Sequence, residues 1–189
     1  MSFIITGLPV ERFSSLFGLA DEALAIRGVQ RHRIQSPRSA PCRITLQDAE
    51  PGETVLLLNH EHQDAPTPYR SSHAIYVREA AREARVLVDE TPDAFLGRTL
   101  SLRLFDGAGM MVDADLCEGA EAPGLIERLL AKPSASYVHA HTARRGCFLA
   151  RIDRAWQRDK RRPGGYQGSG QDFREERAWL ATTSKDGSC

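Results

Sequence analysis

The sequence predicts an α+β domain with a mostly antiparallel sheet that is built from hairpins and has helices packed on one face. Two segments that each read as a pair of strands joined at a glycine carry this prediction, at residues 100–116 and 137–152. Between them, Leu125, Ile126, Leu129 and Leu130 recur at helical spacing, and Pro133 ends the pattern. This helix is expected to cover the apolar side of the sheet.

The first half of the chain predicts shorter elements. Residues 3–6, 54–59 and 73–79 are rich in apolar and β-branched side chains and indicate strands, and residues 42–46 indicate a short extended piece. Residues 9–27 are typical of one or two helices that are interrupted near Gly18, and residues 29–35 alternate weakly. The loop before residue 73 contains two prolines, which exclude a helix there.

The first hairpin has a predicted register. Leu100, Leu102 and Leu104 form one apolar face, and Val112, Ala114 and Leu116 form another. A three-residue loop at 107–109, with Gly109 in the left-handed conformation, brings the two faces together. It also places Arg103 opposite Asp113, so the register predicts a cross-strand ion pair.

The second hairpin determines where its histidines point. A loop at 144–146 with a left-handed Gly146 pairs Val138 with Ile152, Ala140 with Ala150 and Thr142 with Phe148, which gives one coherent apolar face. A four-residue loop mixes polar and apolar groups on both faces. The opposite, polar face then collects Tyr137, His139, His141, Cys147, Leu149 and Arg151.

Composition bears on whether the chain binds nucleic acid or membranes and on the cellular compartment in which we expect it. The 189 residues include 25 Lys+Arg and 25 Asp+Glu, so no net charge attracts the chain to nucleic acid or a membrane. No signal peptide and no apolar run of about 20 residues is evident, and the four cysteines are too widely spaced for a disulfide framework or zinc ribbon. We therefore expect a cytoplasmic protein with one domain at residues 1–156. Residues 157–189 have too few apolar residues for a core and predict a flexible, disordered tail with one helical candidate at 172–181.

The histidine pairs and one cysteine suggest two candidate activities, metal binding and thiol chemistry. His60 with His62, and His139 with His141, are His-x-His pairs whose members share a strand face, but no third ligand follows at a fixed offset. No metal site and no cofactor are therefore predicted. Cys147 lies near three arginines that would stabilise a thiolate, and with His139 and His141 it forms the candidate catalytic set. The alternative for Cys147 is a buried, inert thiol.

Anion binding is the preferred functional interpretation. The candidate ligand-binding residues combine guanidinium, hydroxyl, phenol and imidazole groups, which suit a phosphate or carboxylate. They are Tyr69, Arg70, Ser72, His73, Arg103 and Arg151. The alternative for Arg70 is a structural ion pair with Glu53 or Glu61.

Several segments, in the same order, also resemble one known family. "CRITLQDAEPGETVLLLN", "PYRSSHAIYVRE", "GMMVDAD" and "YVHAHTARRGCFLARID" are similar to blocks of the bacterial family called domain of unknown function 1203, over residues 2–155. The resemblance implies no catalytic residue, substrate or cofactor. The candidate residues themselves predict a domain that binds or acts on a small anionic metabolite. The alternative is a non-catalytic interaction domain, for example a homodimer.

Overall fold

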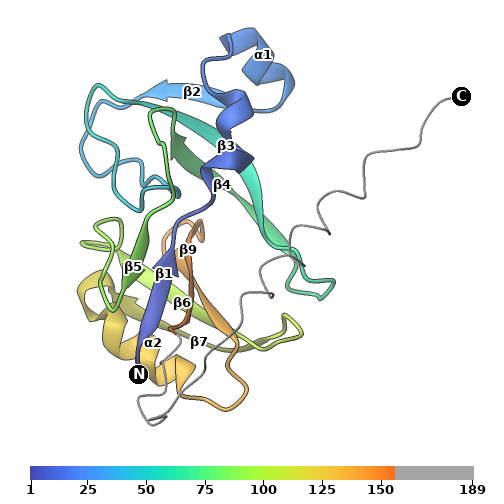
Figure 1. Cartoon of the computed structure of the whole chain (residues 1–189), viewed down its shortest axis with the longest axis vertical. Coiled ribbons are helices and arrows are strands. Elements are labelled where there is room, and N and C mark those ends of the chain that lie inside the picture. Colours follow the sequence, from blue (N-terminus) through green and yellow to red (C-terminus); the bar gives the residue numbers. More distant parts are fainter. Residues whose placement is uncertain (156–189) are drawn as a thin grey trace, which may run out of the picture. The chain divides into compact units, whose positions relative to one another are not determined.

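The computed structural model describes residues 1–155 and arranges their strands in two antiparallel sheets rather than one (Figure 1). The predictions for residues 157–189 lie outside the described residues. No helix within residues 1–155 combines the length and the hydropathy that a membrane span requires. The mostly antiparallel architecture is confirmed, but the strands and helices are divided between two sheets.

The six-stranded sheet contains both predicted hairpins. Its strand order is β5 (Val86–Val88), β1 (Phe3–Thr6), β9 (Phe148–Arg154), β8 (Tyr137–Thr142), β6 (Thr99–Phe105) and β7 (Met111–Glu118). Helix α2 (Ala122–Leu130), preceded by η3 (Gly119–Glu121), packs on one face as predicted. Ile126 and Leu129 of α2 lie in one buried cluster with Leu100, Leu102 and Leu104 of β6.

The three-stranded sheet has the order β2 (Gln30–Arg33), β3 (Thr54–Gln63) and β4 (Ser71–Arg78). Its core includes Phe13, from the segment between the 3-10 turns η1 (Val10–Arg12) and η2 (Ser14–Leu16), and Leu24 of α1 (Asp21–Ile26). The helices therefore do not share one face of one sheet, because the apolar residues before position 27 have a separate core to fill. The predicted extended piece at 42–46 is instead a turn, with Leu46 at a φ of 55°.

The predicted ion pair between Arg103 and Asp113 is wrong. Gly109 has the expected positive φ of 81°, and Phe105 pairs with Met111. The register then shifts, so Leu104 pairs with Asp113 and Arg103 with Ala114. Val112 is thus the extra residue of a bulge, and a one-residue shift moves every later side chain of β7 to the other face. Asp113 consequently pairs with Lys132, just after α2.

A second bulge changes the register of β8 and β9. Gly146 has a φ of 71°, and the pairs of Val138 with Ile152 and of Ala140 with Ala150 are as predicted. The predicted three-residue loop is wrong, because Thr142 donates to the Cys147 carbonyl at 2.9 Å and Phe148 pairs with His141, so the turn spans residues 143–146. Leu149 is the extra residue between this pair and that of Ala140 with Ala150. Phe148 therefore lies on the histidine face, and Leu149 joins the core beneath α2.

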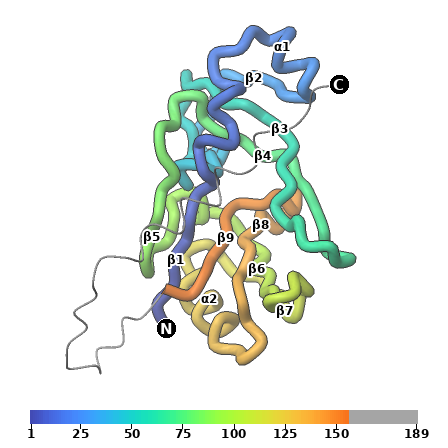
Figure 2. The backbone as a smooth tube through the Cα atoms, turned by 45° about the vertical axis from the view of Figure 1, so that its right-hand side comes forward, coloured from blue at the N-terminus to red at the C-terminus, as the bar shows by residue number. Residues whose placement is uncertain are grey.

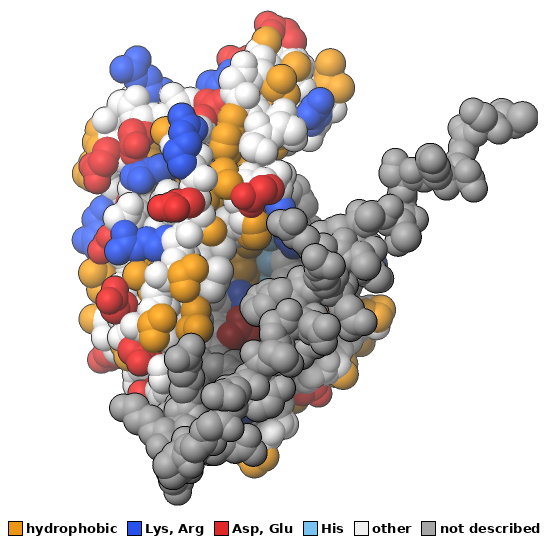
Figure 3. Space-filling view, in the orientation of Figure 1, with side chains coloured by type: hydrophobic (Ala, Val, Ile, Leu, Met, Phe, Trp, Pro, Cys, Tyr) orange, Lys and Arg blue, Asp and Glu red, His pale blue; other side chains and the backbone are white. Residues whose placement is uncertain are grey.

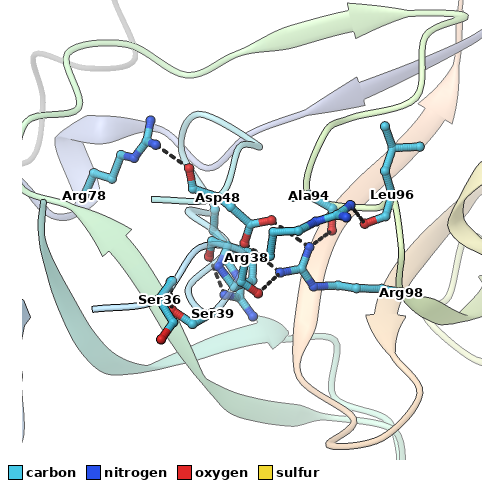
Figure 4. A network of polar contacts seen from close by, with 10 residues as sticks. Ser36, Arg38, Ser39, Asp48, Arg78, Ala94, Leu96 and Arg98 are labelled. Atoms are coloured by element: carbon cyan, nitrogen blue, oxygen red, sulfur yellow. Dashed lines mark hydrogen bonds and ion pairs between the residues drawn. The ribbon is translucent and has the colours of Figure 1, made fainter. Parts of the chain in front are cut away.

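An ion-pair network links loops that lead into the two sheets (Figure 4). Asp48 lies before β3, and both of its carboxylate oxygens accept hydrogen bonds from Arg98, just before β6, at 2.6 and 2.9 Å. Arg98 also donates to the Arg38 carbonyl at 2.8 Å, and Arg38 donates to the Leu96 carbonyl at 2.6 Å. Each loop donates hydrogen bonds to the other, since Arg98 donates to Asp48 and Arg38, and Arg38 donates to Leu96. These contacts hold the two loops against each other.

Candidate functional site

The face of the six-stranded sheet opposite α2 is polar and aromatic, as the second hairpin predicted. The side chains on it are Ser101, Arg103 and Phe105 from β6, Tyr137, His139 and His141 from β8, and Phe148 and Arg151 from β9. The far half of the β3–β4 hairpin lies against this face (Figure 2), where Gln63 donates to the Tyr137 hydroxyl at 2.9 Å. The face is therefore interior. His139 is 1% exposed and His141 is 0% exposed.

Three histidines from three strands meet between the sheets, and we call them the three-histidine cluster. They are His62 of β3, His73 of β4 and His141 of β8, and one ring nitrogen of each lies within 4.8 Å of the others. The closest pair is His62 Nε2 and His73 Nδ1, at 2.8 Å. Outside the grey residues, little histidine surface is visible on the face of the molecule shown in Figure 3. Three imidazole nitrogens this close together are a candidate set of metal ligands.

A third bulge places His62 in this cluster. Glu61 pairs with Ser72 and Gln63 with Ser71, so His62 is the extra residue of β3. A bulge turns the side chain of its extra residue away from the regular alternation, which is why bulges are common beside functional sites. His62 thereby stacks on Phe148, at 4.9 Å between ring centroids and an interplanar angle of 4°.

The ring of His141 is oriented by the turn that follows its strand. Its Nδ1 lies 2.8 Å from the Gly146 carbonyl oxygen, which can only accept, so Nδ1 carries the proton. The lone pair is then on Nε2, which is buried and has no hydrogen-bond partner within residues 1–155. A backbone carbonyl that fixes the tautomer in this way is typical of metal-ligating histidines.

Burial keeps the histidines neutral at pH 7. Desolvation, followed by smaller contributions from neighbouring charges, lowers the pKa of His62 to about 4 and that of His141 to about 3. The same cause lowers the pKa of His139 to about 2, and it also lowers that of the half-buried His73. Neutral imidazole is the form that binds metal ions.

The other predicted catalytic residues lie beside the cluster or apart from it. His139 packs against Phe105 and Phe148, with ring centroids 5.0 and 5.1 Å away, and its buried Nδ1 has no partner in the described part of the chain. Cys147 is partly exposed, and its sulfur contacts the Arg145 carbonyl oxygen at 4.0 Å. No described hydrogen bond joins Cys147 to a histidine.

The predicted anion-binding loop does not converge as one set. Arg70 donates to Glu61 at 2.6 Å, which is the ion pair that the alternative interpretation expected, and Ser72 and Tyr69 are exposed. Arg151 pairs with Asp153 at 2.9 Å and lies over the Tyr137 ring. Of the predicted ligand-binding residues, His73 joins the three-histidine cluster, and Arg103 lies on the same buried face with no carboxylate partner in residues 1–155.

Two clefts lie elsewhere on the described residues. One, of about 480 Å³, borders His60 and is otherwise lined mainly by Arg12, Phe13, Leu16, Arg27 and Leu58. The other, of about 500 Å³, borders Asp48, Arg38 and Leu96 of the ion-pair network described above. Neither is lined by any of the predicted site residues.

Sequence reasoning missed the grouping of His62 with His73 and His141. His-x-His spacing singled out His60 with His62 and His139 with His141, yet each strand supplies only one member of the cluster. His60 instead lies between Phe13 and Phe148, with ring centroids 6.0 and 6.1 Å away. No local signal relates strands of two different sheets, so the set could not be found from spacing.

Comparison with known proteins gives one finding. A family model described as protein of unknown function, DUF1203, matches residues 39–154, a range that contains the whole three-histidine cluster. No curated protein and no solved structure matches the chain. The match covers more than half of the 189 residues, and the chain therefore belongs to the DUF1203 family.

Proposed function

We propose that this protein binds a transition metal ion through His62, His73 and His141, and that Zn²⁺ is the first candidate. The observation that carries the proposal is the buried Nε2 of His141, which has no partner within residues 1–155 and faces two further imidazoles. A buried acceptor without a partner costs roughly 1–3 kcal/mol. A bound metal ion removes that cost, because the lone pair then becomes a ligand.

The distances suit imidazole ligands after small rotations. Zn–N bonds of about 2.1 Å at tetrahedral angles separate two ligand nitrogens by about 3.4 Å. The cluster spans this value, since its nitrogens range from 2.8 Å apart to within 4.8 Å. All three donors are imidazoles, and imidazole suits zinc, copper, iron and nickel better than magnesium or calcium.

Three protein ligands leave a coordination position open. Structural zinc sites usually have four protein ligands, whereas catalytic sites have three and an exchangeable position. We place the small anionic ligand that the sequence predicted at this open position. The 1% and 0% exposure of His139 and His141 favours a ligand site over a contact surface for a partner protein.

Metal titration tests the proposal. We expect the purified, metal-free protein to bind one equivalent of Zn²⁺ in calorimetry, and His62→Gln, His73→Gln and His141→Gln each to bind at least about tenfold more weakly, as expected when a ligand is lost. Bound metal should also raise the Tm, and a chelator should reverse the rise.

His60→Gln is the matched control. His60 is on the same strand as His62, but its ring packs against Phe13 and is not part of the cluster, so its variant should bind Zn²⁺ as the wild type does. His62 and His73 are half-buried and His141 is fully buried, so His62→Gln and His73→Gln are less prone to unfold than His141→Gln. Wild-type protein that binds no Zn²⁺, Cu²⁺, Ni²⁺ or Co²⁺ would refute the proposal, as would equal affinity in His73→Gln and wild type.

A further inference from the structure

The charge of the proposed metal site is unbalanced, and the inference that follows depends on that proposed function. Three neutral imidazoles contribute no negative charge to offset a divalent ion. Zinc sites with carboxylate or thiolate ligands are partly neutralised by the protein, but no acidic residue is part of the three-histidine cluster. A buried net charge without a counter-charge is strongly unfavourable.

Arg103 adds a further positive charge on the same face. It lies directly opposite His139 in the pairing of β6 with β8, and its Nε lies 3.4 Å from the Ser101 hydroxyl oxygen. Ser101 is the residue opposite His141, so the guanidinium extends along β6 toward the strand position beside the cluster. Its proximity also contributes to the lowered pKa values of His62, His73 and His141.

Two carboxylates beside this face are already paired. Glu61 accepts from Arg70, and Asp153 accepts from Arg151. Arg103 is half-buried, desolvation lowers its pKa, and it has no ion pair in the part of the chain that the structure describes. The protein therefore holds an unpaired guanidinium next to a site for a divalent cation.

We propose that a small oxyanion, a carboxylate or a phosphate, occupies the open position of the metal and accepts hydrogen bonds from Arg103. One oxygen of such a ligand contacts the metal, and a second contacts the guanidinium, whose planar fork matches carboxylate and phosphate groups. A monatomic anion such as chloride offers no second atom. Arg103 is thus the residue that selects the ligand class, and the imidazoles select the metal.

The test uses the protein loaded with Co²⁺, which occupies zinc sites and whose visible absorption depends on its ligands. Acetate, inorganic phosphate and chloride are titrated separately into wild type, Arg103→Gln and Arg103→Lys. We expect acetate or phosphate to change the spectrum of the wild type, and the affinity to fall at least about tenfold in Arg103→Gln. Arg103→Lys should be intermediate, because lysine keeps the charge and loses the fork. Comparison of acetate with phosphate identifies which oxyanion is preferred.

Two measurements keep this result separate from the metal site itself. Arg103→Gln should bind Co²⁺ with unchanged or higher affinity, and Arg70→Gln, whose guanidinium is held by Glu61, should bind anions as the wild type does. Co²⁺ binding without any response to acetate or phosphate would overturn the oxyanion inference and leave the metal site standing. Equal anion affinity in Arg103→Gln and wild type would also overturn it, and failure to bind Co²⁺ would refute both proposals.

Discussion

Gly146 connects backbone geometry to the chemistry of the site. Its φ of 71° lies in the left-handed region, and its carbonyl oxygen accepts the Nδ1 proton of His141. The residue that closes the turn thus also determines which nitrogen of His141 is free. A residue with a β-carbon adopts this conformation at a cost of about 1–2 kcal/mol.

Gly146→Ala should therefore lower the free energy of unfolding by about 1 kcal/mol, measured by urea denaturation of the metal-free protein. The added β-carbon would meet only the His73 ring, at 3.7 Å, so the loss is attributed to the backbone and not to a clash. Gly124→Ala, in α2, is the control, since Gly124 has open space and no positive φ. Its stability should be unchanged or slightly higher. Equal losses in both variants would contradict the assignment.

At the scale of elements, single extra residues decide which side chains reach the site. The bulge at His62 adds an imidazole to the cluster, and the bulge at Leu149 places the Phe148 ring where it stacks on His62. The bulge at Val112 moves the later side chains of β7 to the opposite face of the sheet. Val112 and Leu116 consequently lie 42% and 61% exposed instead of in the core. The turn at 107–109 and the left-handed conformations of Gly109 and Gly146 were predicted correctly, whereas the second turn spans residues 143–146 instead of 144–146. The registers therefore differ from the prediction because of the bulges and, in the second hairpin, because of the longer turn.

Glu79 holds the end of β4 to the first half of the chain. Arg31 of β2 donates two hydrogen bonds to its carboxylate, at 2.8 and 2.9 Å, and the Gly18 amide donates a third at 3.1 Å. Bonding to Arg31, followed by the opposing effect of burial, holds the pKa of Glu79 below its usual 4.5. The stabilisation that this shift implies is present above pH 4.5 and is lost as the pH falls through the lowered pKa of the folded state.

We therefore expect Glu79→Gln to be less stable than the wild type at pH 7, and the difference between their free energies of unfolding to shrink below pH 4.5. Denaturation with urea at a series of pH values from 7 to 3 measures this. Glu22→Gln, an exposed site on α1 with no ion pair in residues 1–155, should track the wild type throughout. A difference that stays constant across the series would show that Glu79 acts without its charge.

At the scale of the whole described region, the two sheets depend on each other. The ion pair of Asp48 with Arg98 links loops from both, and its side chains are only 12% and 15% exposed. Arg98→Met should cost about 3 kcal/mol, because it leaves a largely buried carboxylate without its partner. Arg128→Met removes an exposed partner of Asp115 and should cost less than about 1 kcal/mol. Urea denaturation compares the two, and equal losses would contradict a structural role for Arg98.

The sequence by itself determined the antiparallel hairpins, the helix between them, the two left-handed glycines and the face that carries His139 and His141. Each of these depends on local periodicity or on the steric freedom of glycine, which are properties of a short stretch of chain. Family membership likewise follows from the order of matching segments.

Only the tertiary structure decided that the β3–β4 hairpin lies on the histidine face and adds His62 and His73 to His141. That contact joins residues far apart in the chain, and it depends on how two separate cores pack and on bulges that no turn signal marks. It also decided that Arg70 and Arg151 are neutralised by acidic neighbours, whereas Arg103 has none in the described residues. Charge pairing is set by three-dimensional proximity, and residue types alone do not specify it.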